Sequence, residues 1–225
     1  MNQYDKIGKK YLEGQKIHFR KIHDGSTDFI VNAIKQTDFK NKKILDIGCG
    51  DGKHMRLLEK LGAKHVYGLE PSKVMLNEAI KLGSDPKHLI HTTLERNKLS
   101  PNSFEILYAR FSIHHDKTIA SKYRAASKLL KPGGILIITV PHPIRIASLI
   151  KSGVYKSGEK LTTYLFKSRL PIHSHMHTFE EYLSKDFLKD FDLKEFVEEK
   201  NPSIKIGKLK VPEFIGLVAI RRKAK

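Results

Sequence analysis

Three glycines at alternate positions follow an apolar run in ILDIGCGDG, residues 44–52. Glycine has no Cβ, so the backbone N–H groups of such a turn can approach a ligand closely. A dinucleotide site would require Gly-x-Gly-x-x-Gly, but Lys53 stands where the last glycine belongs. A P-loop is excluded because no Gly-Lys-Ser or Gly-Lys-Thr ends the turn. The spacing therefore predicts a nucleotide-binding loop of another type.

A carboxylate stands at the end of the next apolar run, at Glu70, eighteen residues after Gly52. Its two oxygens match the two neighbouring hydroxyl groups of a ribose. An isolated acid at this place would be an ordinary exposed strand end. One that follows a glycine turn by a strand–helix–strand interval predicts ribose binding.

Histidines at two strand ends are candidates for a general base, because the imidazole titrates near neutrality. His114 and His115 follow the expected strand at 104–109, and His142 stands between two prolines after the strand at 135–140. Carboxyl ends of parallel strands line the ligand crevice of open α/β sheets. We expect His115 and His142 to line the active site, and either of them to act as the base. The alternatives are a helix cap for the former and a rigid turn for the latter.

A third group of histidines lies in IHSHMH, at His173, His175 and His177. On an extended strand all three project to one face, so a tri-histidine metal centre is an alternative. No cysteine or carboxylate pattern supports it, and we expect no metal. We expect this segment to be a lid over the acceptor pocket, with His177 among the residues that touch substrate.

Apolar strands alternate with amphipathic helices over most of the chain, which favours a parallel sheet with helices on both faces. Thr178 and Glu181 have capping-box spacing at the start of the expected helix 178–191. We expect a single domain over 1–225, with an N-terminal helical cap at 1–40, a cofactor-binding core at 41–141, a substrate lid at 142–177 and closing elements at 178–225. The expected strands are 42–48, 64–70, 88–93, 104–109, 135–140, 192–199 and 213–222, and the expected helices are 51–62, 71–83, 116–130 and 178–191.

The net charge of +18 would attract RNA, DNA, anionic membranes or acidic metabolites. The basic residues are 33 Lys against nine Arg, scattered along the chain, and this favours a solvated surface over a nucleic-acid footprint. No apolar stretch has the roughly 20 residues that a membrane span needs. The opening MNQYDKIGKKYLEG has no apolar core for a secretory signal, and Cys49 is the only cysteine. These features predict a cytoplasmic protein.

Four motifs in order carry a resemblance to class I S-adenosylmethionine-dependent methyltransferases: ILDIGCGDG, VYGLEPS, SPNSFEILYARFSIHH and LLKPGGILIITVPHP. The chain looks closest to the small-molecule branch that includes quinone-biosynthesis methyltransferases. Its opening segment YDKIGKKY resembles the N-terminal cap helix of that branch. The resemblance implies an α/β, Rossmann-like doubly wound sheet of seven mostly parallel strands, the last antiparallel, with helices on both faces.

S-adenosylmethionine is the cofactor that the resemblance implies. Asp46 and backbone carbonyls would meet its ammonium group, and the adenine would lie near the Pro71–Ser72 turn and Thr93. Relatives commonly have Asp where Thr93 stands, and Glu95 is a candidate substitute. The expected cofactor-binding residues are Tyr11, Asp46, Gly48, Cys49, Gly50, Gly52, Glu70, Pro71, Ser72, Thr93, Leu94 and Ala109.

Methyl transfer from this activated cofactor is an in-line displacement, for which an enzyme supplies positioning and, where needed, a base. The sequence predicts transfer to a small-molecule acceptor. One alternative is an RNA methyltransferase that uses the basic surface. The other is a binding protein that keeps the fold without catalysis, because fold alone does not guarantee activity. The acceptor atom and the oligomeric state do not follow from the residues.

Overall fold

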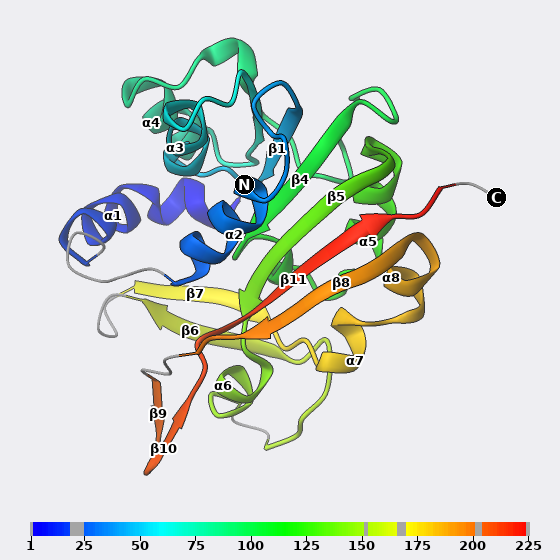
Figure 1. Ribbon diagram of the computed structural model, residues 1–225. Coiled ribbons are helices and arrows are strands. Elements are labelled where there is room, and N and C mark those ends of the chain that lie inside the picture. The colour runs from blue at the N-terminus through cyan, green and yellow to red at the C-terminus, as the bar shows by residue number, and fades with distance from the viewer. Residues whose placement is uncertain (1, 19–24, 151–152, 166–169, 201–203, 224–225) are drawn as a thin grey trace.

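The computed structural model describes residues 2–18, 25–150, 153–165, 170–200 and 204–223. Seven strands form the central sheet in the order β3-β2-β1-β4-β5-β11-β8 (Figure 1). The first five run parallel, whereas β11 pairs antiparallel with both β5 and β8. Their bounds are β1 Lys43–Ile47, β2 His65–Leu69, β3 Leu89–Ile90, β4 Phe104–Arg110, β5 Leu130–Pro141, β8 Phe191–Glu198 and β11 Phe214–Arg221. The expected doubly wound sheet with an antiparallel last strand is confirmed.

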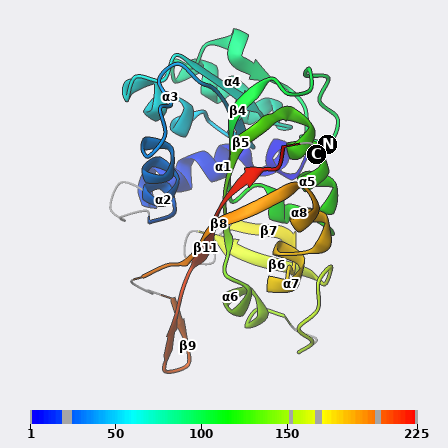
Figure 2. The same ribbon diagram turned by 45° about the vertical axis from the view of Figure 1, so that its right-hand side comes forward.

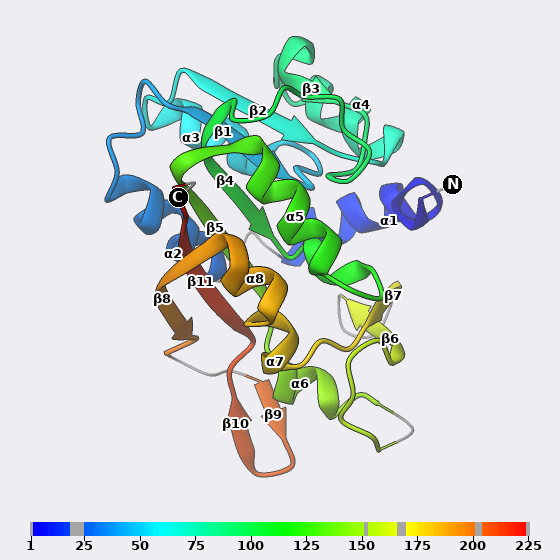
Figure 3. The same cartoon turned by 90° about the vertical axis from the view of Figure 1, so that its right-hand side faces the viewer.

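Helices cover both faces of this sheet (Figures 2 and 3). On one face, Tyr123 of α5 and Phe187 of α8 pack in a core with Leu107 and Leu136 of the strands. On the other face, α2, α3 and α4 contribute to a second core that contains Ile106. Burial on both faces explains why the parallel strands are continuous apolar runs. The helix bounds are α1 Gln3–His18, α2 Gly25–Lys35, α3 Lys53–Lys60, α4 Lys73–Lys81, η1 Pro86–His88, η2 Ile113–His115, α5 Ala120–Leu129, α6 Pro143–Ala147, α7 Phe179–Tyr182 and α8 Lys185–Asp190.

Helix α1 bridges the two sides of the sheet's carboxyl edge. At one side Asp5 accepts a hydrogen bond from the Ser72 hydroxyl at 2.9 Å, at the start of α4. At the other side Gln3 exchanges two hydrogen bonds with the backbone of His173, each 3.1 Å. The helix therefore links the cofactor-loop half of the molecule to the segment expected to be a lid.

That segment contains an antiparallel hairpin of β6, Lys160–Leu165, and β7, Leu170–His175, together with α6. Side chains on β7 alternate, with Leu170, Ile172 and Ser174 buried. Ile146 of α6, Leu161 and Met176 form a small separate core beneath the hairpin. The hairpin alternation is short and contains histidines and a proline, so the sequence pattern did not reveal it.

Two expected elements differ in the structure, and one further element was not expected. The helix 178–191 is divided into α7 and α8, because Leu183 leaves the helical conformation and Ser184 is extended. Thr178 is nevertheless the N-cap of α7, since its hydroxyl accepts from the Glu181 N–H at 3.3 Å, but the reciprocal bond of a capping box is not formed, because the Thr178 N–H donates to the Ser157 hydroxyl at 3.0 Å. The strand 88–93 is reduced to β3. A second hairpin of β9, Ile204–Ile206, and β10, Leu209–Val211, was not predicted.

No helix in the part of the chain that the structure describes is both long and apolar enough to cross a membrane.

Candidate cofactor and acceptor site

The glycine turn after β1 has the left-handed backbone that its residues predict. Gly48, Gly50 and Gly52 have φ values of 77°, 56° and 71°. The N–H groups of Gly48 and Cys49 both donate to the Leu69 carbonyl, at 2.8 and 3.0 Å, which fastens the turn to the end of β2. A Cβ added to Gly48 would lie 2.4 Å from the Cβ of Ser112. Glycine is therefore required here both by the backbone conformation and by the neighbouring loop.

Glu70 closes the turn from the end of β2. Its two carboxylate oxygens accept from the N–H groups of Gly50, at 3.0 Å, and Ser72, at 2.8 Å. The side chain is buried, and this burial raises its pKa to about 7, with the two N–H donors partly offsetting the effect. The carboxylate is thus held rigidly at the place where the sequence predicts a ribose contact.

Asp46 lies in β1 directly below the turn and is buried. The Tyr108 hydroxyl donates to its carboxylate at 2.7 Å. Burial raises the pKa of Asp46 to about 7, although the Tyr108 hydrogen bond acts in the opposite direction. A cationic ligand beside Asp46 would restore its charge, because an opposite charge favours the ionised form.

A cavity of about 660 Å³ opens beside these groups. It extends from the glycine turn to the β6–β7 hairpin, so it brings together residues from both halves of the chain. Its volume lies within the range of about 300 to 1,000 Å³ that is typical of ligand sites. The expected residues that line it are Tyr11, Asp46, Gly48, Cys49, Gly50, Glu70, Pro71, Thr93, Leu94 and His115.

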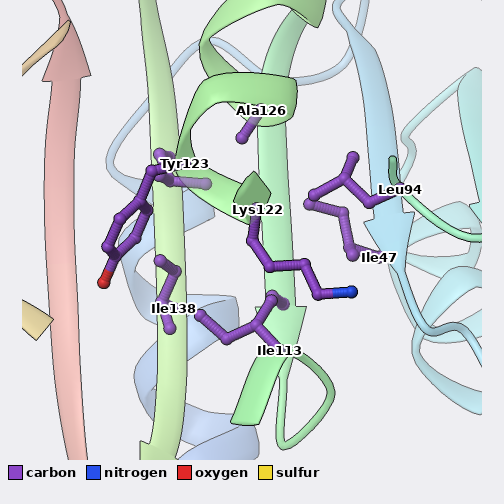
Figure 4. A pocket seen from close by; sticks show the side chains of 9 residues that line it. Ile47, Leu94, Ile113, Lys122, Tyr123, Ala126 and Ile138 are labelled. Atoms are coloured by element: carbon purple, nitrogen blue, oxygen red, sulfur yellow. The ribbon is translucent and has the colours of Figure 1, made fainter. Parts of the chain in front are cut away.

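Three expected cofactor residues lie elsewhere. Gly52 begins α3 in the left-handed conformation, and a Cβ there would meet the Ser84 hydroxyl at 2.4 Å. Ser72 caps α4 and donates to Asp5. Ala109 faces a separate apolar cavity of about 10 Å³ under α5 (Figure 4). None of these three residues lines the large cavity, so they support the site indirectly.

Glu95 does not substitute for the acid that relatives commonly have at Thr93. The Lys122 ammonium forms ion pairs with Glu95 at 2.6 Å and with Asp116 at 2.5 Å. Ser121 also donates to the Glu95 carboxylate at 3.3 Å. Figure 4 shows the Lys122 side chain extending across toward Leu94 and Ile47. Thr93 and Leu94 line the cavity at this end, whereas Glu95 is held outside it.

His115 lies in η2 at the carboxyl end of β4 and lines the cavity. Its Nε2 is 3.4 Å from the Tyr4 hydroxyl of α1, whereas its Nδ1 is buried without a hydrogen-bond partner among the described residues. Burial lowers the pKa of His115 to about 4, and lowers that of the adjacent His114 well below its usual value. Both rings are therefore neutral at pH 7. They can accept or donate hydrogen bonds, but His115 is a weak proton acceptor.

His142 and His177 are not brought to the cavity, so the expectation that they line it does not hold. His142 caps α6, with Nδ1 accepting from the Ile144 N–H at 3.2 Å and Nε2 lying 2.9 Å from Glu198. His177 is held between Glu181, at 2.9 Å, and the His114 carbonyl, at 3.1 Å. Both rings are buried and use both nitrogens in local structure, which is the structural alternative for a histidine at a turn.

The three histidines of the third group do not converge. His173 Nδ1 lies 3.0 Å from the Thr162 hydroxyl, and His175 Nδ1 lies 3.0 Å from the His115 carbonyl. Strand β7 ends at His175, so His177 leaves the face that the other two share. Over the described ranges, no group of three or more His, Cys, Asp or Glu side chains could hold a metal.

The tertiary structure adds Phe111 and residues of the β6–β7 hairpin to the lining, and sequence patterns identified none of them. Phe111 has a φ of 48°, which is rare for a bulky residue and places its ring against His114. The Arg110 guanidinium lies over the Phe111 ring at 5.0 Å and donates to Ser26 of α2 at 2.9 Å. No periodic signal marks a single strained residue, and the hairpin residues Thr163 and Ile172 were hidden in an unpatterned segment.

The geometry fits S-adenosylmethionine. Glycines without Cβ atoms allow the backbone to approach the ligand, Glu70 can receive ribose hydroxyls, and Asp46 can face a cationic amino group. Both carboxylates have raised pKa values that a cationic ligand would lower again. The fold and the arrangement of these groups are those expected for a class I S-adenosylmethionine-dependent methyltransferase, and they agree with the cofactor expected from the sequence.

Residues 45–138 match a family model described as a methyltransferase domain. A tRNA U34 carboxymethyltransferase from Shewanella putrefaciens is 30% identical over 130 residues, which are 54% of this chain and 39% of that protein. A protein of the same name from Vibrio cholerae is 26% identical over 232 residues, covering 94% of this chain and 71% of that protein. The chain thus spans about two fifths of the Shewanella relative.

Among solved structures, the fold is similar to that of an S-adenosylmethionine dependent methyltransferase from Mesorhizobium loti. The TM-score is 0.65 at 20% identity, and the alignment covers 88% of this chain and 99% of the other.

Proposed function

We propose that this protein transfers a methyl group from S-adenosylmethionine to an acceptor bound beside the β6–β7 hairpin. The observation that carries the proposal is the shared cavity of about 660 Å³, which Asp46, Glu70 and His115 all line. The bound cofactor supplies an activated methyl group on a sulfonium. The chain's own residues hold the cofactor, align the acceptor and exclude water.

Positioning dominates this mechanism. His115 is neutral at pH 7, so it orients an acceptor by a hydrogen bond and is a poor proton store. The Tyr4 hydroxyl, whose pKa burial raises well above its usual value, stays protonated and can donate to the His115 ring. This contact holds the ring, whose other nitrogen is buried without a hydrogen-bond partner among the described residues. An acceptor atom that is already nucleophilic suits such a site best.

We propose a base of an RNA as the acceptor. Two relatives are named tRNA U34 carboxymethyltransferases, and one of them aligns with 94% of this chain. The net charge of +18 supports an anionic polymer as partner. Enzymes that modify a base commonly take it out of the stack into a pocket, and the cavity has room for a ligand beside the cofactor end.

A small-molecule acceptor is the second candidate, and it is the one that the sequence motifs favoured. The cover that α1 and the β6–β7 hairpin form over the carboxyl edge supports it, because such a cover suits an acceptor that is enclosed completely.

Methyl-labelled S-adenosylmethionine distinguishes the two. The purified protein is incubated with labelled cofactor and a cell extract, and label is measured separately in RNA, protein and small molecules. Label in RNA is the expected result. Label confined to small molecules would replace the RNA acceptor with the second candidate. Cofactor binding with no transfer to any fraction would contradict the proposed activity and favour a non-catalytic binding protein.

A further inference from the structure

The hairpin of β9 and β10 forms a two-stranded sheet of its own, outside the central sheet. In all three views it projects from the body at the end opposite α3 and α4 (Figures 1–3). A lone two-stranded hairpin is marginally stable in water. Its sequence, IKIGKLKV at 204–211, carries three lysines and no acid.

The lysines are arranged in a way that disfavours the hairpin by itself. Lys205 and Lys210 are directly opposite each other across the two strands, and both are exposed. Like charges in this position repel. Lys208 adds a third exposed ammonium group at the turn. Within the described residues none of the three has an ion-pair partner. An anion placed along this face would remove the repulsion.

The base of the hairpin reaches the cavity. Glu199 precedes β9 and Glu213 follows β10, and both line the cavity. They join the two ends of the hairpin, because the Glu213 N–H donates to the Glu199 carboxylate at 2.7 Å. Glu213 is also paired with Arg145 at 3.4 Å. These two carboxylates are therefore engaged at the rim and do not neutralise the lysines at the tip.

We propose that the β9–β10 hairpin is an RNA-binding arm, whose lysines contact backbone phosphates while a neighbouring nucleotide enters the cavity. This inference rests on the proposed RNA acceptor. Phosphate contacts position a nucleic acid without reading its sequence, and lysine serves this role as a point charge. A charged arm rooted at the cavity rim places the acceptor strand beside the site that modifies it.

The test compares two triple variants with equal loss of charge. Lys205→Ala/Lys208→Ala/Lys210→Ala removes the arm's charge. The matched control, Lys60→Ala/Lys81→Ala/Lys87→Ala, removes three exposed lysines on and just after α3 and α4. Binding of a tRNA mixture is measured by fluorescence anisotropy at several salt concentrations, with cofactor affinity measured alongside. The arm variant is expected to bind at least about tenfold more weakly, and to lower the slope of log K against log salt by about 2. Cofactor affinity should stay unchanged.

A second variant separates binding from folding. Lys210→Glu places opposite charges at the paired positions, so the melting temperature should stay equal or rise while RNA affinity falls. If the hairpin had only a structural role, RNA affinity would not fall in a variant whose melting temperature is unchanged or higher.

The outcomes keep the two proposals apart. A wild-type protein that neither binds nor labels RNA would overturn the RNA acceptor. A wild-type protein that does both, with the arm variant indistinguishable from the control, would overturn the arm alone. If the arm variant lost binding to anionic lipid vesicles but kept its RNA binding, the arm would be assigned to a membrane surface. This result would also overturn the proposal of an RNA-binding arm.

Discussion

We propose that ribose recognition in this site depends on Glu70. A hydrogen bond to a charged group contributes about 1.5–3 kcal/mol. Glu70→Gln keeps the size of the side chain but removes its charge and one acceptor for the Gly50 and Ser72 N–H groups. We expect cofactor affinity to fall by at least about tenfold, measured by titration calorimetry. The exposed acid of β8 provides a matched control, Glu195→Gln, and an equal affinity in both variants would contradict the ribose role.

The two buried carboxylates also predict proton release on cofactor binding. The pKa values of Asp46 and Glu70 are each raised to about 7, so both are partly protonated at pH 6.5 before the ligand binds. A cationic ligand favours their charged forms, and affinity should therefore rise as the pH increases through 7. Calorimetry at pH 6.5 in phosphate and in Tris should show proton release that decreases in Asp46→Asn. Identical enthalpies in the two buffers would contradict this.

The same shifts have a defined effect on stability. A carboxyl group whose folded pKa is raised stabilises the fold at pH values below its unfolded pKa, near 4, and this contribution is lost as the pH rises through about 7. The unliganded protein should therefore lose stability toward pH 8 relative to Asp46→Asn, and bound cofactor should restore it. Thermal melts at pH 5 and pH 8 measure both effects.

The pKa shift of His115 has the opposite effect on the pH dependence of stability. Burial lowers its pKa to about 4, so its neutral form stabilises the fold above about pH 6.5, and this contribution is lost as the pH falls toward 4. We expect His115→Gln to melt with less dependence on pH between 7 and 5 than the wild type. The His115 ring should titrate near pH 4 by NMR. A midpoint near 6.5 would restore His115 as a strong candidate for the general base.

At the scale of elements, we propose that α1 covers the cofactor end of the cavity. Its attachment to α4 depends on Asp5, which accepts from the Ser72 hydroxyl, and α1 contributes Tyr4 and Tyr11 to the cavity. Asp5→Asn should loosen this helix and weaken cofactor affinity by about three- to tenfold, since one charge-assisted hydrogen bond is reduced. Hydrogen exchange over residues 3–14 should quicken. Glu13→Ala, an exposed acid of the same helix, is the control, and unchanged exchange in Asp5→Asn would contradict this attachment.

At the scale of the whole molecule, the excess of 18 positive charges predicts how transfer to RNA depends on salt. Phosphate contacts release counterions, so KM for RNA should rise steeply between 50 and 200 mM salt, whereas KM for the cofactor should change little. Steady-state kinetics at fixed cofactor and varied RNA measure the difference. A shallow dependence for RNA would indicate that the lysines form a solvated surface, as their scattered distribution suggested.

The sequence by itself determined the sheet, the glycine turn and the acid at the end of β2. These features follow from local rules: fully apolar parallel strands, glycines at left-handed positions, and a carboxylate at a fixed interval along the chain. The mostly parallel sheet agrees with that analysis, and Asp46, Gly48 and Glu70 line one cavity.

Only the tertiary structure decided which histidine reaches the cavity. His115, His142 and His177 are alike in sequence, since each stands near the end of a strand. Their surroundings separate them: His142 and His177 are held by Glu198 and Glu181, whereas His115 faces Tyr4, 111 residues earlier in the chain. The tertiary structure also decided that the two hairpins form, because their short strands exist only through pairing with each other. Contacts between residues far apart in the chain set a side chain's direction and its pKa, and no local pattern encodes them.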